Sequence, residues 1–156
     1  MIQITVYALP APQGSKRFVG HAKNGRGIMI ESSKRVRPWR EAVKWAALDV
    51  MRRDGHYTLP GGEFMTGPIR VEMIFTLPKP KSAPKSRKLA DRKPDLSKLV
   101  RSTEDALTDA GVWEDDARIV ECIAAKVFPG EHALSLPVPG ASIRIFSALE
   151  RGVERT

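Results

Sequence analysis

The chain has 156 residues, a hydrophobic fraction of 42% and a formal net charge of +8. This length and hydrophobic content predict a single domain over residues 1–156 with a packed core, and they exclude a largely disordered chain. Aromatic residues make up only 6% of the chain, which argues against a protein built mainly to stack nucleobases. The charge indicates an acidic partner, with nucleic acid first; a merely soluble basic protein is the alternative.

The single cysteine, Cys122, excludes a disulfide within the chain and a multi-cysteine zinc site. Its neighbours are typical of a strand, so we expect a buried and unreactive thiol. The three histidines are scattered and lack the spacing of metal ligands. No signal-peptide pattern and no apolar run of membrane-spanning length is visible, so we expect a cytoplasmic protein without a membrane partner.

The first predicted element is a half-buried strand in "MIQITVYAL", where apolar and polar residues alternate. The segment that follows is rich in Pro, Gly and basic residues. It predicts a loop or irregular hairpin that starts another short strand near Ile28. Lys16 and Arg17 in this segment are candidate phosphate contacts. The alternative is that the segment is merely a flexible loop.

Apolar residues at helical spacing predict a helix that begins at Pro38 and ends near Asp54. A strand in "PIRVEMIFTL" comes next. Residues 78–94 then contain four prolines and little apolar content, which predicts a flexible basic loop. Its candidate DNA contacts are Arg87, Lys88, Arg92 and Lys93, and a solvated surface loop is the alternative.

The clearest helix is predicted from Asp95 to Asp109, because apolar residues recur there at helical spacing. Its opposite, polar side comprises Asp95, Lys98, Arg101, Ser102, Asp105 and Asp109. Asp95 can also serve as the helix N-cap, which is a structural alternative to any functional role. After Gly111, Trp113 is expected to pack beneath the helix.

Two further strands, "ARIVECIAAKVF" and "ASIRIFSAL", complete the chain. The predicted fold class is therefore a small α/β (α+β-like) domain, in which two helices cover a mixed four-stranded sheet. The predicted order is β-α-β-α-β-β.

Charge changes sign abruptly along the second half of the chain. Residues 79–101 contain nine Lys or Arg and two Asp, whereas residues 102–128 contain seven Asp or Glu and two basic residues. A simple electrostatic DNA binder gains nothing from an acidic segment beside its basic one. The pattern is useful where a cation lies between carboxylates and phosphate, as in metal-dependent phosphodiester hydrolysis. Asp95, Asp105, Asp115 and Asp116 are the candidate ligands, although acidic turns after helices are common.

The stretch "KPDLSKLVRSTEDALTDAGVWEDDARIVECIAAK" resembles the signature block of the RusA family of Holliday junction resolvases. The resemblance is strong over residues 92–126 and weak before residue 90. It implies a dimeric, Mg²⁺-dependent endonuclease that makes paired cuts across four-way DNA junctions, of a kind often encoded by phages and prophages. It also implies Mn²⁺ as a possible substitute metal, no small-molecule cofactor, and a place in the cytoplasm with the nucleoid.

The resemblance assigns metal-ligand and catalytic roles to Asp95 and Asp116. Asp105 and Asp115 are the candidate residues that would help them hold the metal. Arg101 stands where the family has a catalytic Lys, and it keeps the charge but not the compact ammonium. Two departures matter: Ser97 replaces a family Asp and Lys98, a further candidate DNA contact, replaces an Asn. The loss of a carboxylate at Ser97 leaves three outcomes open: Asp105 or Asp115 completes the metal shell, the metal binds more weakly, or the protein binds branched DNA without cutting it.

Overall fold

The structure, a computed structural model, describes residues 1–14, 16–31, 34–54 and 65–149. Its main sheet has the strand order β1-β6-β4-β5, with antiparallel pairing of β6 to β1 and β4, and parallel pairing of β4 to β5. These strands are β1 (Ile2–Val6), β4 (Ile69–Thr76), β5 (Ile119–Val127) and β6 (Gly140–Ser147).

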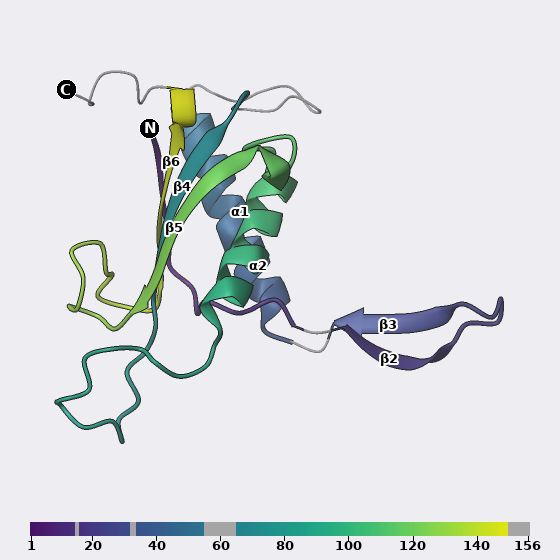
Figure 1. Ribbon diagram of the computed structural model, residues 1–156, viewed down its shortest axis with the longest axis horizontal. Coiled ribbons are helices and arrows are strands. Elements are labelled where there is room, and N and C mark those ends of the chain that lie inside the picture. Colours follow the sequence, from purple (N-terminus) through teal and green to yellow (C-terminus); the bar gives the residue numbers. More distant parts are fainter. Residues whose placement is uncertain (15, 32–33, 55–64, 150–156) are drawn as a thin grey trace.

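Two helices, α1 (Val36–Arg53) and α2 (Leu96–Asp109), lie on one face of this sheet (Figure 1). The predicted fold class and the order β-α-β-α-β-β are therefore confirmed for the main domain. Helix α1 begins two residues before Pro38, where the sequence analysis had placed its start. A short 3₁₀ helix, η1 (Asp116–Arg118), connects α2 to β5.

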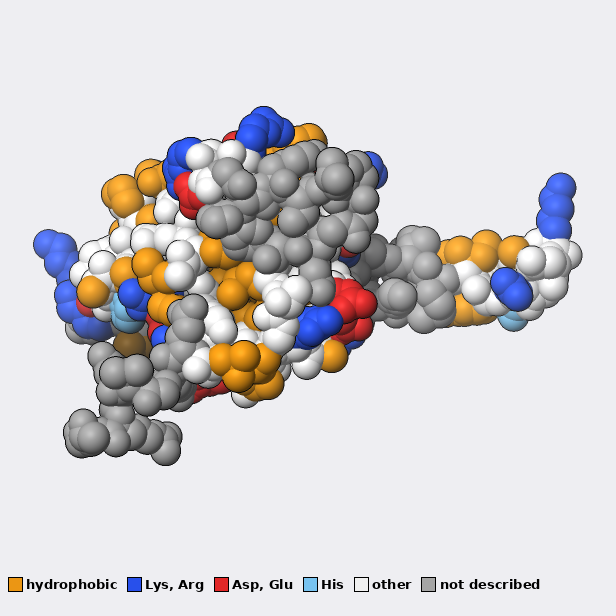
Figure 2. Space-filling model, turned by 90° about the horizontal axis from the view of Figure 1, so that it is seen from above, with side chains coloured by type: hydrophobic (Ala, Val, Ile, Leu, Met, Phe, Trp, Pro, Cys, Tyr) orange, Lys and Arg blue, Asp and Glu red, His pale blue; other side chains and the backbone are white. Residues whose placement is uncertain are grey.

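The predicted irregular hairpin is a separate two-stranded sheet of β2 (Lys16–His21) and β3 (Gly27–Glu31). It projects from the body as an arm (Figure 1). Figure 2 shows apolar side chains along the arm and basic side chains at its far end, where Lys23 and Arg26 are exposed beside the turn at Gly25. Lys16 and Arg17 lie in β2, but their side chains are outside the described part of the structure.

The core forms where α1, α2 and the sheet meet. Trp39 of α1 is buried, and its ring lies 6.3 Å from that of Phe75 on β4. The indole Nε1 of Trp39 donates a hydrogen bond of 3.1 Å to Oγ1 of Thr103 on α2. At the rim of the same interface, Arg40 and Asp109 form an ion pair of 2.8 Å. The buried contact of Trp39 with Thr103 helps to fix the rotation of α2 about its axis, whereas the exposed ion pair contributes little.

Ser102 corrects the predicted polar side of α2. The sequence analysis placed it on the exposed side, yet it is fully buried. Its hydroxyl donates to the carbonyl oxygen of Ala11 at 2.7 Å, with the Leu99 carbonyl oxygen at 3.1 Å. The proline-rich segment after β1 crosses this part of α2 and covers it, which a helical pattern alone does not reveal.

Cys122 is a second correction. The thiol was expected to be buried, but the residue is exposed. The reason is that β5 is an edge strand of the sheet, so its side chains have a neighbouring strand on one side only. Partial burial of the sulfur, together with the negative charge of Glu104, raises the pKa of the thiol, which keeps it protonated near neutral pH.

Replacing Ser102 with Ala should destabilise the fold by about 1–2 kcal/mol, because the buried Ala11 carbonyl oxygen loses its donor. Urea unfolding measures this difference. The matched control is Ser97→Ala, an exposed position on the same helix, where we expect a change within about 0.5 kcal/mol. Equal stability of the two variants would contradict the anchoring role of Ser102.

Candidate metal and DNA site

Asp95 is the N-cap of α2, as the sequence analysis allowed. Its side chain makes no capping hydrogen bond, and the nearest cation is Lys98, whose Nζ lies 3.9 Å from the Asp95 Oδ2. The carboxylate is 53% exposed. Capping therefore does not account for this side chain, and its oxygens face solvent at the beginning of α2.

The other predicted acidic residues gather around the second half of α2. Asp115 is the N-cap of η1 and accepts a hydrogen bond of 2.7 Å from the backbone amide of Ala117. This bond, together with a hydrogen bond to Asp116, lowers the pKa of Asp115. Burial, the hydrogen bond to Asp115 and the charges of Asp115 and Asp105 raise the pKa of Asp116. The two adjacent carboxyl groups thus have pKa values shifted in opposite directions.

Glu104 belongs to the same group, although the sequence analysis did not single it out. Burial, and after it the charges of Asp116 and Asp105, together raise its pKa to about 7. A helical spacing of three residues from Arg101 was the signal that could have identified it. Arg101 opposes these effects, since its positive charge lowers the pKa of both Glu104 and Asp116.

We call Glu104, Asp105, Asp115 and Asp116 the acidic cluster, and Arg101 is its neighbouring cation. Asp95 does not join it: ten residues of helix separate Asp95 from Asp105, which is about 15 Å along the axis. Among the residues that the structure describes, no three His, Cys, Asp or Glu side chains are placed as ready metal ligands. In the view from above, acidic side chains lie beside basic ones near the base of the arm (Figure 2).

The acidic cluster nevertheless fits Mg²⁺ in its donor chemistry. Mg²⁺ prefers oxygen ligands and keeps several waters, so one or two protein carboxylates and a substrate phosphate suffice. Burial is the largest cause of the raised pKa values of Glu104 and Asp116, and the negative charges of neighbouring carboxylates add to it. A divalent cation would relieve this repulsion.

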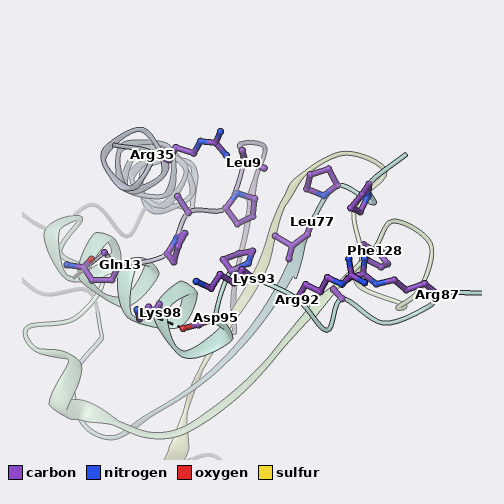
Figure 3. A pocket seen from close by; sticks show the side chains of 18 residues that line it. Leu9, Gln13, Arg35, Leu77, Arg87, Arg92, Lys93, Asp95, Lys98 and Phe128 are labelled. Carbon is purple, nitrogen blue, oxygen red and sulfur yellow. Dashed lines mark ion pairs between the residues drawn. The ribbon is translucent and has the colours of Figure 1, made fainter. Parts of the chain in front are cut away.

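At the beginning of α2 lies a cavity of about 870 Å³, which we call the basic cavity. It brings together four of the predicted DNA contacts, Arg87, Arg92, Lys93 and Lys98, and it also includes Asp95. Figure 3 shows these side chains on α2 and on the loop that precedes it. The predicted contact Lys88 does not line the cavity and instead pairs with Glu131 at 3.6 Å.

The loop of residues 78–94 was expected to be flexible and contains no helix or strand. It is nevertheless tied to the domain at several points. Lys126 of β5 donates to the carbonyl oxygens of Arg92 and Pro94 at 2.5 and 2.9 Å. Arg87 pairs with Asp91 at 2.9 Å and lies 5.4 Å from the ring centre of buried Phe128. These anchors hold the cationic side chains of the loop around the cavity.

Glu104→Gln should stabilise the protein more at alkaline than at acidic pH. The folded-state pKa of about 7 lies above the ordinary value of 4.5, so burial of Glu104 carries no charge penalty below pH 4.5. Between about pH 4.5 and 7 the wild type loses stability, because the unfolded state releases a proton that folded Glu104 still binds, and the loss is complete above about pH 7. Thermal unfolding should therefore show an advantage of the variant that grows from about pH 5 to pH 8.

The control for this measurement is Glu41→Gln, an exposed position on α1. It removes a carboxyl group from the other helix, outside the acidic cluster, and so reports the general effect of this substitution on the melting temperature. If Glu104→Gln gave a shift that did not change with pH, Glu104 would not carry the raised pKa, and its place in the acidic cluster would be wrong.

No helix of the described residues is long and apolar enough to cross a membrane. Comparison with known proteins identifies the domain itself. The chain is 27% identical over 147 residues to "Uncharacterized protein YqaN" of Bacillus subtilis (strain 168), which covers 88% of this chain and 94% of that protein. A family described as "Endodeoxyribonuclease RusA" matches residues 9–138, which span the basic cavity and the acidic cluster. The chain thus belongs to the RusA family of Holliday junction resolving endodeoxyribonucleases.

Proposed function

We propose that the protein is a Mg²⁺-dependent endonuclease that resolves four-way DNA junctions by paired nicks, with Mn²⁺ as a possible substitute metal. One observation carries the proposal: helix α2 has a cation-rich cavity at its beginning and a crowded acidic cluster at its end. One DNA strand that follows α2 could therefore place phosphates on the cationic side chains at its beginning and on a divalent cation at its end. Family membership supports the nuclease activity.

Asp116 and Asp115 would hold the metal, with Asp105 and Glu104 beside them. When bound, Mg²⁺ supplies a nucleophilic water and neutralises phosphate charge. Arg101 lies close enough to influence both Glu104 and Asp116 electrostatically, so its guanidinium is placed to stabilise charge on a phosphate at the cluster. Arg101 would act through its permanent positive charge and not by proton transfer.

Asp95 would act differently from the sequence expectation. One Mg²⁺ ion, with ligand distances of about 2.1 Å, cannot contact both Asp95 and Asp105 of one chain. Asp95 lines the basic cavity and pairs loosely with Lys98. We therefore propose that Asp95 orients Lys98 toward the DNA, or binds a separate ion that enters with the phosphates.

Retained activity despite Ser97 is supported by the position of Glu104. Ser97 is exposed in the first turn of α2, four residues before Arg101. Residues at this spacing share one face of a helix, and Glu104 follows Arg101 after three residues on the same side. A carboxylate at Glu104 thus adds negative charge near Arg101 that the Ser at position 97 does not provide.

Paired nicks need two active sites related by the two-fold symmetry of the junction, so we propose a homodimer. The edge strand β5 leaves its backbone unpaired on one side and exposes one apolar residue on each face, Val120 and Ile123, at 65% and 48%. The work of such a dimer is DNA recombination and repair in the cytoplasm, in association with the nucleoid, of a bacterial or phage-infected cell.

A second function is favoured by Ser97: a relative that binds branched DNA without cutting it. The absence of a ready three-ligand site among the described residues supports this alternative as well. It predicts junction binding that does not depend on Mg²⁺, and no nicked product.

Single-turnover cleavage of a mobile four-way junction with Mg²⁺, run beside a linear duplex, tests the proposal. We expect paired nicks in the junction only. Asp116→Asn should slow cleavage by at least about 100-fold while junction binding persists, because it removes a metal ligand without removing a DNA contact. The matched control is Asp109→Asn, a carboxylate of α2 that pairs with Arg40 outside the acidic cluster, and its cleavage should resemble that of the wild type.

Three other outcomes have distinct meanings. A shifted junction band without nicks would favour the binding protein, and restoration of cleavage by Ser97→Asp would then identify Ser97 as the cause. Cleavage by Asp116→Asn at the wild-type rate would contradict the metal-binding role of the acidic cluster. Neither binding nor cleavage in a folded wild type would contradict the proposed function itself.

A further inference from the structure

We infer that the basic cavity takes one unpaired deoxynucleotide, with its base against the apolar part of the lining and its phosphates on the cationic side chains. The inference rests on the proposed function, because the DNA strand must reach α2. It adds a binding mode, since a site for duplex phosphates alone needs charge but no deep apolar surface.

The size and lining fit a nucleotide. A volume of about 870 Å³ lies within the range of small-molecule sites and exceeds what a phosphate group requires. Much of the lining is apolar or proline, including Leu9, Pro10, Leu77 and Pro78. Leu9 is 43% exposed although it is a large apolar residue at the mouth of a concave site. Covering apolar surface of this kind with a flat, weakly hydrated base is favourable, because it removes the surface from water.

The positive charge of the cavity lining favours an anionic ligand. Five cationic side chains line the cavity, against the single carboxylate of Asp95. Arg87 is held by Asp91, but Arg35, Arg92 and Lys93 have no carboxylate within ion-pair distance among the residues that the structure describes. Figure 3 shows Arg35 at one end of the cavity and Arg87 at the other, with Lys93 and Arg92 between them. A nucleotide with a phosphate on either side matches this distribution.

The occupant should be unpaired because a base inside a duplex is unavailable to the cavity. Extruding a paired base costs a few kcal/mol, and the cost is least where pairing or stacking is already interrupted. A branch point interrupts stacking where the strands exchange. The cavity would thus favour branched over linear DNA by capturing a nucleotide beside the crossover.

Equilibrium binding of the full-length protein to a fluorescein-labelled oligothymidylate of about ten nucleotides tests this inference. The comparison is an oligonucleotide of equal length with stable abasic sites, which keeps the phosphates and removes the bases. Fluorescence anisotropy without metal should give about tenfold weaker binding of the abasic oligonucleotide. Leu9→Ser should remove most of this difference.

Leu89→Ser is the matched control, because Leu89 is 76% exposed in the neighbouring loop but does not line the cavity. It should keep the preference for the oligonucleotide with bases. Arg92→Ala should weaken both oligonucleotides by a similar factor, whereas Lys81→Ala, outside the lining, should change binding less.

Equal affinity for the two oligonucleotides would overturn the inference, because the cavity would then recognise phosphates only. A base preference that survives Leu9→Ser would overturn it as well, since the base would bind elsewhere. In both cases normal junction cleavage would leave the proposed function intact. If the wild type bound neither the oligonucleotides nor the junction and did not cleave the junction, both this inference and the proposed function would be contradicted.

Discussion

The whole arrangement depends on how helix α2 is fixed about its axis. Thr103 accepts a hydrogen bond from the Trp39 indole and donates one of 2.8 Å to the Leu99 carbonyl oxygen, both in the buried interior. Ser102, one residue earlier, is bound to the backbone at Ala11. Because these neighbouring residues are held from two directions, α2 cannot rotate without breaking buried hydrogen bonds. Breaking them would leave buried polar groups without partners and so destabilise the fold. Arg101 and Glu104 are consequently kept facing the turn that carries Asp116.

The connection from β4 through α2 to β5 then separates the two functional groups of side chains. The loop before α2 brings cations to the beginning of the helix, and the turn after it brings carboxylates to the end. Lys126 of β5 links the strand back to the loop through the carbonyl oxygens of Arg92 and Pro94. A basic DNA surface and an acidic cluster can coexist in one small domain because the helix keeps them apart, rather than letting them neutralise one another.

Much of this could be predicted from the sequence, for physical reasons that are specific to each element. The α2 pattern was strong because Leu99, Ala106 and Leu107 recur at helical spacing and are all buried. Alternating apolar and polar residues predicted the strands of the main sheet. The order of elements along the chain, β-α-β-α-β-β, is confirmed for the main domain. The family resemblance was correct because its motif lies in this best-determined segment.

What escaped prediction depended on contacts between distant segments. Ser102 is buried because residues near Ala11 cross α2, ninety-one positions earlier in the chain. Cys122 is exposed because β5 lies at the sheet edge, and strand order cannot be read from a single strand. The basic cavity joins four separate segments, and the raised pKa of Glu104 arises from burial that only the fold creates. The separation of Asp95 from Asp105, in contrast, follows from helix length alone.

The central claim is that the divalent cation binds at the end of α2 and not at its beginning. Paramagnetic broadening of backbone amide signals by substoichiometric Mn²⁺ measures this directly, without DNA and without activity. The account predicts that amides of residues 101–105 and 114–118 broaden first, while those of residues 96–99 are much less affected. Broadening centred on residues 96–99, around Asp95, would contradict the account and place the metal beside the basic cavity instead.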